Sequence, residues 1–228
     1  MNTVPSLDFD PALQPRPVRA ALVWAVGLPG CPKTGAAPAY LAGLLARVRA
    51  AGKGFLSPER TAAVRDMLRF GSYKPSGRGK PSSEYLLAAA LEGAFPLVNP
   101  PVDSNNAVSL EWGYPASIFD LDLCGPRLLL RRGAAGESYI FNPSGQGIDV
   151  ADLLCVCCMR EGAWAPCGNP VKDALATKIR ESTRSVAAVV YAPASDPADD
   201  LEAAAARFAG LLRTECCAAE SGWTVPAK

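Results

Sequence analysis

The chain has 228 residues, 49% of them hydrophobic, and its 23 basic and 22 acidic residues leave a formal net charge of +1. This composition predicts one globular domain with a full hydrophobic core. The sequence contains no histidine, which excludes Ser-His-Asp and Cys-His catalytic machinery and His-ligated metal sites. A catalyst built from this chain must use carboxylates, hydroxyls, backbone donors, metal-bound water held by other ligands or a group on the substrate.

No apolar run approaches the roughly 20 residues that cross a bilayer. Residues 1–19 carry two aspartates and four prolines, which is unlike a signal peptide. We therefore expect a cytoplasmic protein that does not enter a membrane.

Residues 1–20 are rich in proline and are expected to form an extended segment. The run 21–26 predicts a strand, and helices are expected over 38–51, over 57–69 with Ser57 as N-cap, and from Pro81 onward. Between the last two helices, 72–80 is expected to be a flexible basic loop.

From Pro96 the pattern changes to short strands and turns. Strands are expected at 118–122, 127–132, 138–142, 153–159 and 187–191. A helix is expected near 172–181, and 196–217 is a predicted amphipathic helix. Helices followed by a sheet with interspersed helices predict an α+β fold with mixed β-sheet layers and flanking helices. We expect a single domain over 21–228.

Eight cysteines invite a metal or redox interpretation. Cys155 and Cys158 form a CxxC, and Cys167 follows nine residues later, but a well-spaced second pair is missing. The stretch 153–159 is better explained as a buried strand in which cysteine acts as a small hydrophobe. We expect reduced thiols, with no metal site and no cofactor.

Positive charge is concentrated between residues 47 and 80, where nine basic residues face Glu59 and Asp66. Such a cluster can meet a phosphate backbone. On charge alone, two solvated helices with long basic side chains explain it equally well.

The segment 97–122 contains the pattern N-x-x-x-D-x-x-N-x(4)-E-x-G-x-P-x-x-x-F-D. Its fixed positions are Asn99, Asp103, Asn106, Glu111, Gly113, Pro115, Phe119 and Asp120. The pattern resembles the segment that builds the amino-acid pocket of the phenylalanyl-tRNA synthetase beta-subunit editing domain, in particular its free-standing relatives. Weaker similarity extends the resemblance over about 65–192.

The resemblance implies an enzyme that acts in trans on aminoacylated tRNA and hydrolyses mischarged esters. Asn106 would line the pocket, and Ser117 would stand where the synthetase has a histidine; these two are the candidate catalytic residues. Gln146 or Asp149 would replace the pocket glutamate. The closing segment would add Lys172 and Asp173 to the substrate-binding residues. The tRNA would contact the basic residues of the 65–80 region, namely Arg65, Arg69, Lys74, Arg78 and Lys80.

Several of these residues also suit purely structural roles. Residues 103–106 are typical of a loop that caps a helix. Asp120 and Asp122 are expected on one face of a strand, where ion pairs with Arg127, Arg131 and Arg132 are preferred to a bound cation. Lys172 and Asp173 also suit a first helical turn. The alternative function is a non-catalytic module that binds tRNA, another RNA or an amino acid.

Overall fold

The computed structural model describes residues 4–14 and 17–226. Its α-helices are α1 (Ala39–Ala51), α2 (Pro58–Leu68), α3 (Ser82–Leu91), α4 (Pro100–Trp112), α5 (Leu121–Cys124) and α6 (Ala198–Thr214). Its strands are β1 (Ser6–Phe9), β2 (Val18–Val26), β3 (Ala116–Asp120), β4 (Arg127–Arg132), β5 (Ser138–Ile140), β6 (Gly147–Asp149), β7 (Leu154–Arg160), β8 (Ala163–Gly168), β9 (Ser185–Pro193) and β10 (Glu220–Thr224). Short 3₁₀ helices lie at Pro11–Leu13, Gly52–Phe55, Gly77–Gly79 and Leu175–Thr177. The predicted α+β class is confirmed.

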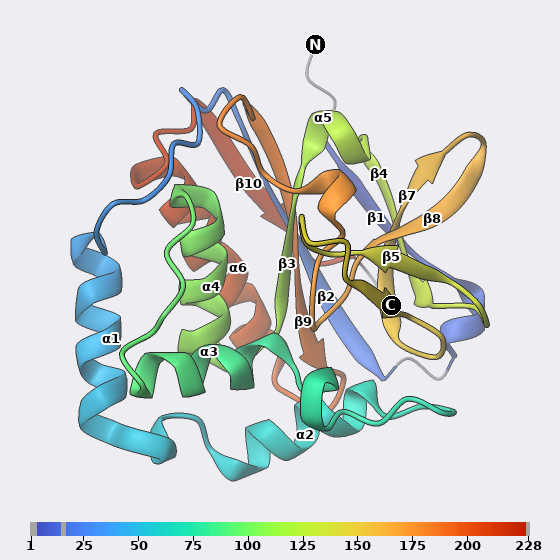
Figure 1. Cartoon of the computed structure of the whole chain (residues 1–228), viewed down its shortest axis with the longest axis horizontal. Helices are drawn as coiled ribbons and strands as arrows, with labels where there is room; N and C mark the ends of the chain where they lie inside the picture. Colours follow the sequence, from blue (N-terminus) through green and yellow to red (C-terminus); the bar gives the residue numbers. More distant parts are fainter. Residues whose placement is uncertain (1–3, 15–16, 227–228) are drawn as a thin grey trace.

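Two four-stranded sheets form the frame, in the orders β10-β2-β9-β3 and β1-β4-β7-β8, and β5 and β6 form a separate hairpin. All described pairings between named strands are antiparallel except that of β1 with β4. Helices α1, α3, α4 and α6 lie on one side of the β10-β2-β9-β3 sheet, and the second sheet lies on the other (Figure 1). The main core fills the space between these layers, and a smaller core joins α1, α3 and α4.

The amino-terminal segment belongs to the domain and is not a separate extension. Strand β1 pairs with β4 from Ser6 opposite Arg127 to Phe9 opposite Leu130. Leu7 and Leu13 are each only 4% exposed, so burial of these two side chains anchors the segment. Residues 1–3 and 15–16 of the predicted segment lie outside the described residues.

Several predicted elements are confirmed with small shifts in their ends. Helices α1, α2 and α3 lie where expected, and Ser57 Oγ accepts a hydrogen bond from the Arg60 N–H at 3.1 Å as the N-cap of α2. Strands β4, β7 and β9 also match. The loop 72–80, predicted to be flexible, contains a 3₁₀ turn that is closed by a hydrogen bond from the Tyr73 hydroxyl to Gly79 O at 2.6 Å.

Three predictions about elements were wrong or incomplete. Residues 100–112, expected as turns and strand, form helix α4. The predicted helix over 172–181 is absent, and only the 3₁₀ turn Leu175–Thr177 is formed there. The carboxy-terminal helix is followed by β10, which pairs with β2 and was not predicted.

Candidate active site

Helix α4 carries the middle of the sequence motif. Asn99 caps it, because its Oδ1 accepts a hydrogen bond from the Val102 N–H at 3.1 Å, and two prolines occupy its first positions. Residues 103–106 therefore lie inside a helix, and the prediction that they form a capping loop was wrong. The prolines fit here because the first helical N–H groups need no intrahelical partner.

Most motif residues hold this helix and the strand after it in place. Asp103 accepts hydrogen bonds from the Val98 N–H at 2.7 Å and from the Thr34 hydroxyl. Gly113 ends α4 at φ +73°, a left-handed conformation that favours glycine. Glu111 forms an ion pair with Arg47 at 2.5 Å. The motif is thus largely a scaffold, and its fixed position Asn106 lines a cavity.

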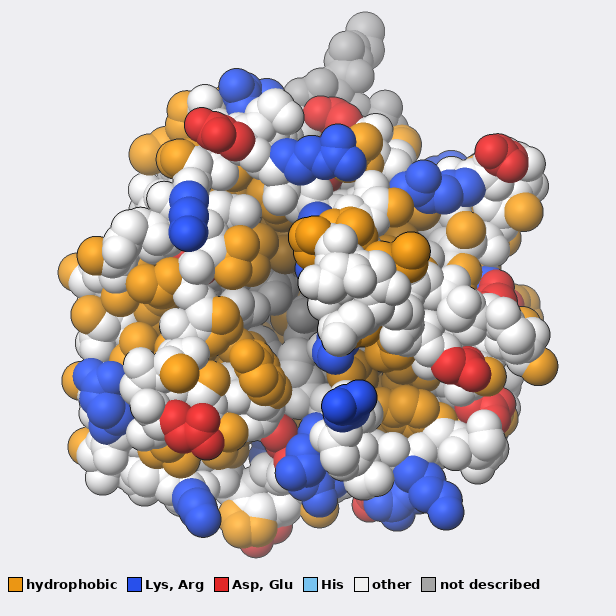
Figure 2. Space-filling view, in the orientation of Figure 1, with side chains coloured by type: hydrophobic (Ala, Val, Ile, Leu, Met, Phe, Trp, Pro, Cys, Tyr) orange, Lys and Arg blue, Asp and Glu red, His pale blue; other side chains and the backbone are white. Residues whose placement is uncertain are grey.

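That cavity, here called the inner cavity, has a volume of about 200 Å³ and lies between α3, α4, β3 and the segment 169–173. Its polar lining residues are Ser82, Asn105, Asn106, Asn169, Lys172 and Asp173. Figure 2 shows a hollow where α3 and α4 face the other half of the molecule. The structure therefore brings together three of the predicted site residues: Asn106, Lys172 and Asp173.

Three polar atoms of the inner cavity are buried and have no hydrogen-bond partner. They are Ser82 Oγ, Asn105 Oδ1 and Asp173 Oδ1, and only two other such side-chain atoms occur in the described part of the chain. A buried polar atom without a partner costs about 1–3 kcal/mol. Three in one cavity indicate a place built to receive a polar ligand.

The orientation of the Asn105 amide agrees with this. Its Nδ2 donates to Ala116 O at 3.3 Å and lies 3.4 Å from Asn106 Oδ1. Both partners are acceptors, so they require the amide nitrogen on that side and leave Oδ1 as the unpaired acceptor.

Asp173 is a carboxyl group with a buried, unpaired Oδ1, and a backbone N–H of β3 holds its other oxygen. Its Oδ2 accepts from the Ile118 N–H at 3.0 Å. Burial raises the pKa of Asp173 to about 7, although the hydrogen bond from the Ile118 N–H and the nearby Lys178 charge oppose the rise. Near neutral pH this carboxyl group is populated in both its protonated and its ionised form, which suits a general base.

Ser117 lies beneath the cavity and does not line it. Its side chain is fully buried, with Oγ 2.9 Å from the Tyr191 hydroxyl, and it donates to Asn169 O at 3.1 Å. Because Ser117 is buried outside the inner cavity, a substrate in that cavity would not contact it as predicted. Ser117 can act only through Asn169 and Asp173, as a positioning residue.

Asn169 shapes the closing segment. Its Oδ1 accepts from the Val171 N–H at 2.8 Å and the Lys172 N–H at 2.9 Å, and its amide donates to the Tyr139 hydroxyl. Tyr139 in turn donates to Lys172 O at 2.6 Å. These side-chain bonds compete with helical ones, which explains why the predicted helix over 172–181 does not form and Lys172 is not in a first helical turn.

Gln146 and Asp149 lie elsewhere. Both line a second cavity of about 600 Å³, here called the hairpin cavity, beside the β5–β6 hairpin. Gln146 is tied to Asn142, whose Nδ2 donates to Gln146 Oε1 at 2.7 Å, and Asp149 accepts from the Ala151 N–H at 2.8 Å. Neither residue joins Asn106 in the inner cavity.

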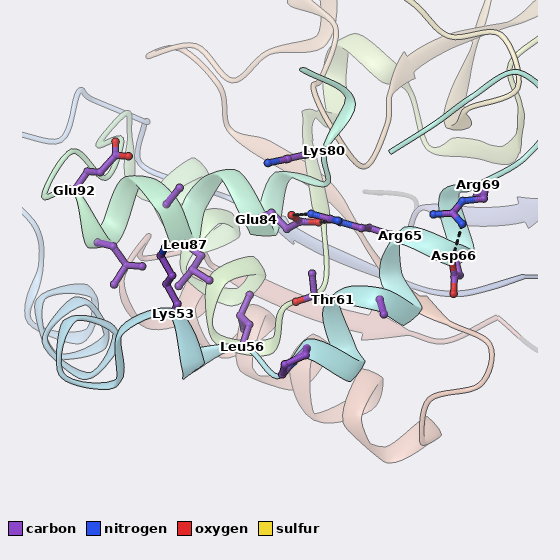
Figure 3. A pocket seen from close by; sticks show the side chains of 14 residues that line it. Lys53, Leu56, Thr61, Arg65, Asp66, Arg69, Lys80, Glu84, Leu87 and Glu92 are labelled. Atoms are coloured by element: carbon purple, nitrogen blue, oxygen red, sulfur yellow. Dashed lines mark hydrogen bonds and ion pairs between the residues drawn. The ribbon is translucent and has the colours of Figure 1, made fainter. Parts of the chain in front are cut away.

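The predicted tRNA-binding residues fall into two groups, those already paired with a carboxylate and those without an ion pair in the described part of the chain. Arg65 donates twice to the Glu84 carboxylate, with Nε 2.6 Å from Oε1, and Arg69 pairs with Asp66 at 3.3 Å. Both line an open groove of about 800 Å³, here called the α2–α3 groove, where Arg65 reaches Glu84 and Arg69 lies beside Asp66 (Figure 3). Lys74, Arg78 and Lys80 are exposed, and none of them has an ion pair within the described residues.

The predicted ion pairs of Asp120 and Asp122 were wrong. Strand β3 ends at Asp120, which caps α5 by accepting from the N–H groups of Asp122 and Leu123. Its Oδ2 also accepts from the Thr183 hydroxyl at 2.6 Å. Arg131 instead pairs with Glu137, with Nη2 2.6 Å from Oε1, so the two aspartates do not share a strand face.

The cysteines behave as predicted from the strand pattern. Cys155, Cys157 and Cys158 are fully buried in β7, and all eight thiols are free. Within the described residues there is no group of three or more Cys, Asp or Glu side chains arranged to hold a metal ion.

Sequence reasoning missed Ser82, Asn105 and Asn169. The first two are adjacent to residues that were noticed, and a helical periodicity through 100–112 would have placed Asn105 and Asn106 beside β3 and α3. No local signal identifies Asn169, because its partners Tyr139 and Ser117 are 30 and 52 residues away.

A family model described as "B3/4 domain" matches residues 75–198, more than half of the chain. The chain belongs to the B3/4 domain family. This confirms the resemblance predicted from the 97–122 pattern. The match includes the whole of α3 and α4, the inner cavity and the closing segment.

Among solved structures, the B3/4 chain is similar to an N-terminal fragment of the phenylalanyl-tRNA synthetase beta subunit from Pyrococcus horikoshii. The identity is 8% and the TM-score 0.49, and the alignment covers 100% of this chain and 56% of that fragment. A similarity this low says nothing about a shared activity. No curated protein matches the sequence. No helix in the described ranges is long and apolar enough to span a bilayer.

Proposed function

We propose that the protein is a trans-acting aminoacyl-tRNA deacylase that hydrolyses mischarged aminoacyl esters in the cytoplasm. The observation that carries the proposal is the set of three unpartnered buried atoms in the inner cavity, next to Asn106. The resemblance of the 97–122 segment to an editing pocket supplies the reaction class.

The lone pairs in the cavity match the amino-acid half of such a substrate. Asn105 Oδ1 and Asp173 Oδ1 are acceptors, so they suit the N–H groups of an α-amino group. The rest of the lining is apolar, including Leu86, Val102 and Ile118. A cavity of about 200 Å³ with this lining suits one amino-acid side chain and is too small for a nucleotide.

Hydrolysis needs a water molecule, a proton acceptor and donors for the oxyanion. We assign the proton acceptor to the ionised Asp173 carboxylate. Water attacks the ester carbonyl carbon and gives its proton to Asp173. The tetrahedral intermediate then expels the ribose oxygen, which takes that proton and leaves a free amino acid and a tRNA with a free hydroxyl group. Asn106 and the Lys172 ammonium hold the substrate.

The test is release of amino acid from a panel of correctly charged and mischarged tRNAs. General-base catalysis contributes about 10²–10⁴-fold, so Asp173→Asn should lower kcat by a factor in that range. Asn106→Ala should raise KM. The matched control is Asp199→Asn, at the exposed first turn of α6, which should retain wild-type rates. If no tRNA in the panel is hydrolysed faster than the uncatalysed rate, the deacylase is ruled out.

The alternative is a B3/4 module that binds tRNA, another RNA or an amino acid without hydrolysing anything. The full burial of Ser117 at the position of the family histidine favours it. Binding of aminoacyl-tRNA that is weakened by Asn106→Ala, with no turnover, would select this alternative.

A further inference from the structure

Lys172 stands where three cavities meet. It lines the inner cavity, the hairpin cavity and a third one of about 650 Å³, here called the vestibule. The vestibule shares Tyr85, Val171 and Asp173 with the inner cavity. It also shares Lys80, Glu84 and Ala88 with the α2–α3 groove. The vestibule therefore adjoins both the α2–α3 groove and the inner cavity.

The vestibule offers aromatic faces. Tyr85, on α3, lines both the vestibule and the inner cavity, and 62% of it is exposed to solvent. Phe141 also lines the vestibule, and Lys172 Nζ lies over one face of its ring, 4.0 Å from the centre. Proteins that bind single-stranded nucleic acids use such side chains: the bases stack on the aromatic rings, and the cationic groups contact the phosphate backbone.

The charge of the vestibule favours an anion. Its cationic residues are Arg78, Lys80, Lys172 and Lys178, and its acidic ones are Glu84 and Asp173. Glu84 is already neutralised by Arg65. Arg78 is exposed and forms no hydrogen bond or ion pair with the residues that the structure describes, so its guanidinium group is available to a phosphate.

We propose that the vestibule binds the 3′-terminal nucleotide of the tRNA, with the base on Phe141 and its 5′-phosphate at Arg78. The ester on the ribose then passes Lys172 into the inner cavity. This inference rests on the proposed function and adds the residues that hold the RNA end. A volume of about 650 Å³ lies within the roughly 300–1,000 Å³ of small-ligand sites, whereas the inner cavity is too small for a nucleoside.

The test is calorimetric titration of the full chain with the dinucleotide cytidylyl-(3′→5′)-adenosine, with adenosine and with AMP. Loss of one stacking platform costs about 5- to 150-fold in affinity, so Phe141→Ala should weaken dinucleotide binding by a factor in that range. Phe141→Leu, which keeps an apolar side chain without an aromatic face, should show the same direction of change. Phe70→Ala is the matched control: Phe70 is 52% exposed and stacks on Arg132 outside the cavities.

Arg78→Ala should weaken the dinucleotide and leave adenosine unchanged, because adenosine has no phosphate. Dinucleotide binding that is tighter than AMP binding identifies an RNA end as the ligand, and tighter AMP binding identifies a free nucleotide and overturns the proposal. Equal losses in Phe141→Ala and Phe70→Ala also overturn it.

The two proposals fail in different ways. Deacylation that proceeds with unchanged KM in Phe141→Ala would leave the enzyme standing and remove the nucleotide site. Dinucleotide binding that depends on Phe141, without any deacylation, would leave the nucleotide site standing and remove the enzyme.

Discussion

A Cβ atom on Gly168 would lie 2.5 Å from Oδ1 of Asp173. The same atom would also collide with the ring of Phe119, which is fully buried. The glycine thus allows β8 to approach the carboxylate that we assign as proton acceptor, and the position of Asp173 depends on the absence of a side chain there.

Gly168→Ala should therefore disturb both stability and the site. Overpacking of this kind costs about 1–3 kcal/mol, measurable as a lower urea midpoint. The control is Gly210→Ala in α6, where a Cβ would meet nothing within 4 Å and where the change should stabilise the protein by up to about 1 kcal/mol. Unchanged stability in Gly168→Ala would mean that Asp173 is not held against β8.

The pKa of Asp173 predicts a pH dependence of stability. Burial raises it to about 7 from an ordinary value of 3.8, so the folded state holds this proton more tightly than the unfolded state does. The free energy of unfolding should fall as the pH rises from about 4 to 7 and level off above that, because the unfolded state binds fewer protons in this window. The full contribution is on the order of 4 kcal/mol.

Asp173→Asn should remove this fall, which urea denaturation at about pH 5 and about pH 8 would measure. Asp199→Asn, at an exposed position, should retain it. The decisive quantity is the difference in free energy of unfolding between the wild type and Asp173→Asn. If this difference is the same at both pH values, Asp173 titrates near its ordinary pKa and cannot be the proposed base.

Thr183→Val should destabilise the turn that follows β3. The Thr183 hydroxyl donates to Asp120 Oδ2 at 2.6 Å, and both residues are at most 5% exposed. Leaving a buried acceptor unpaired costs about 1–3 kcal/mol. Thr214→Val, which removes an exposed hydroxyl at the end of α6, should change the free energy of unfolding by less than about 0.5 kcal/mol. Equal effects of the two substitutions would contradict the role of Thr183.

Thiol titration should find one reactive cysteine. Cys217 is the exposed thiol and the other seven are buried. A hydrogen bond with the Cys167 thiol lowers the pKa of Cys158, but Cys158 is fully buried, and reactivity needs access as well as thiolate. Ellman's reagent should modify about one thiol in the native protein and all eight after unfolding. Cys217→Ser should abolish the native reaction; fast modification of a second thiol would show that β7 opens.

Local patterns determined the elements whose stabilising interactions are local. The Ser57 cap and the apolar periodicity of 38–51 identified α2 and α1, and the continuous apolar run at 153–159 identified β7. The spacing from Asn99 to Asp120 identified the B3/4 family, because that spacing builds the scaffold of α4 and β3. Helix α4 was missed, because the whole region from Pro96 was expected to form short strands and turns.

The contents of the site were decided by contacts between distant residues. Asn106, on α4, meets Lys172 and Asp173 only because the Asn169 and Tyr139 hydrogen bonds hold the closing segment in a turn, and those bonds join residues 30 apart. The amino acid sequence determined which polar groups are present and that histidine is not among them. The tertiary structure decided which of those groups are buried and left without partners, because desolvation and hydrogen bonding depend on the neighbours that folding supplies.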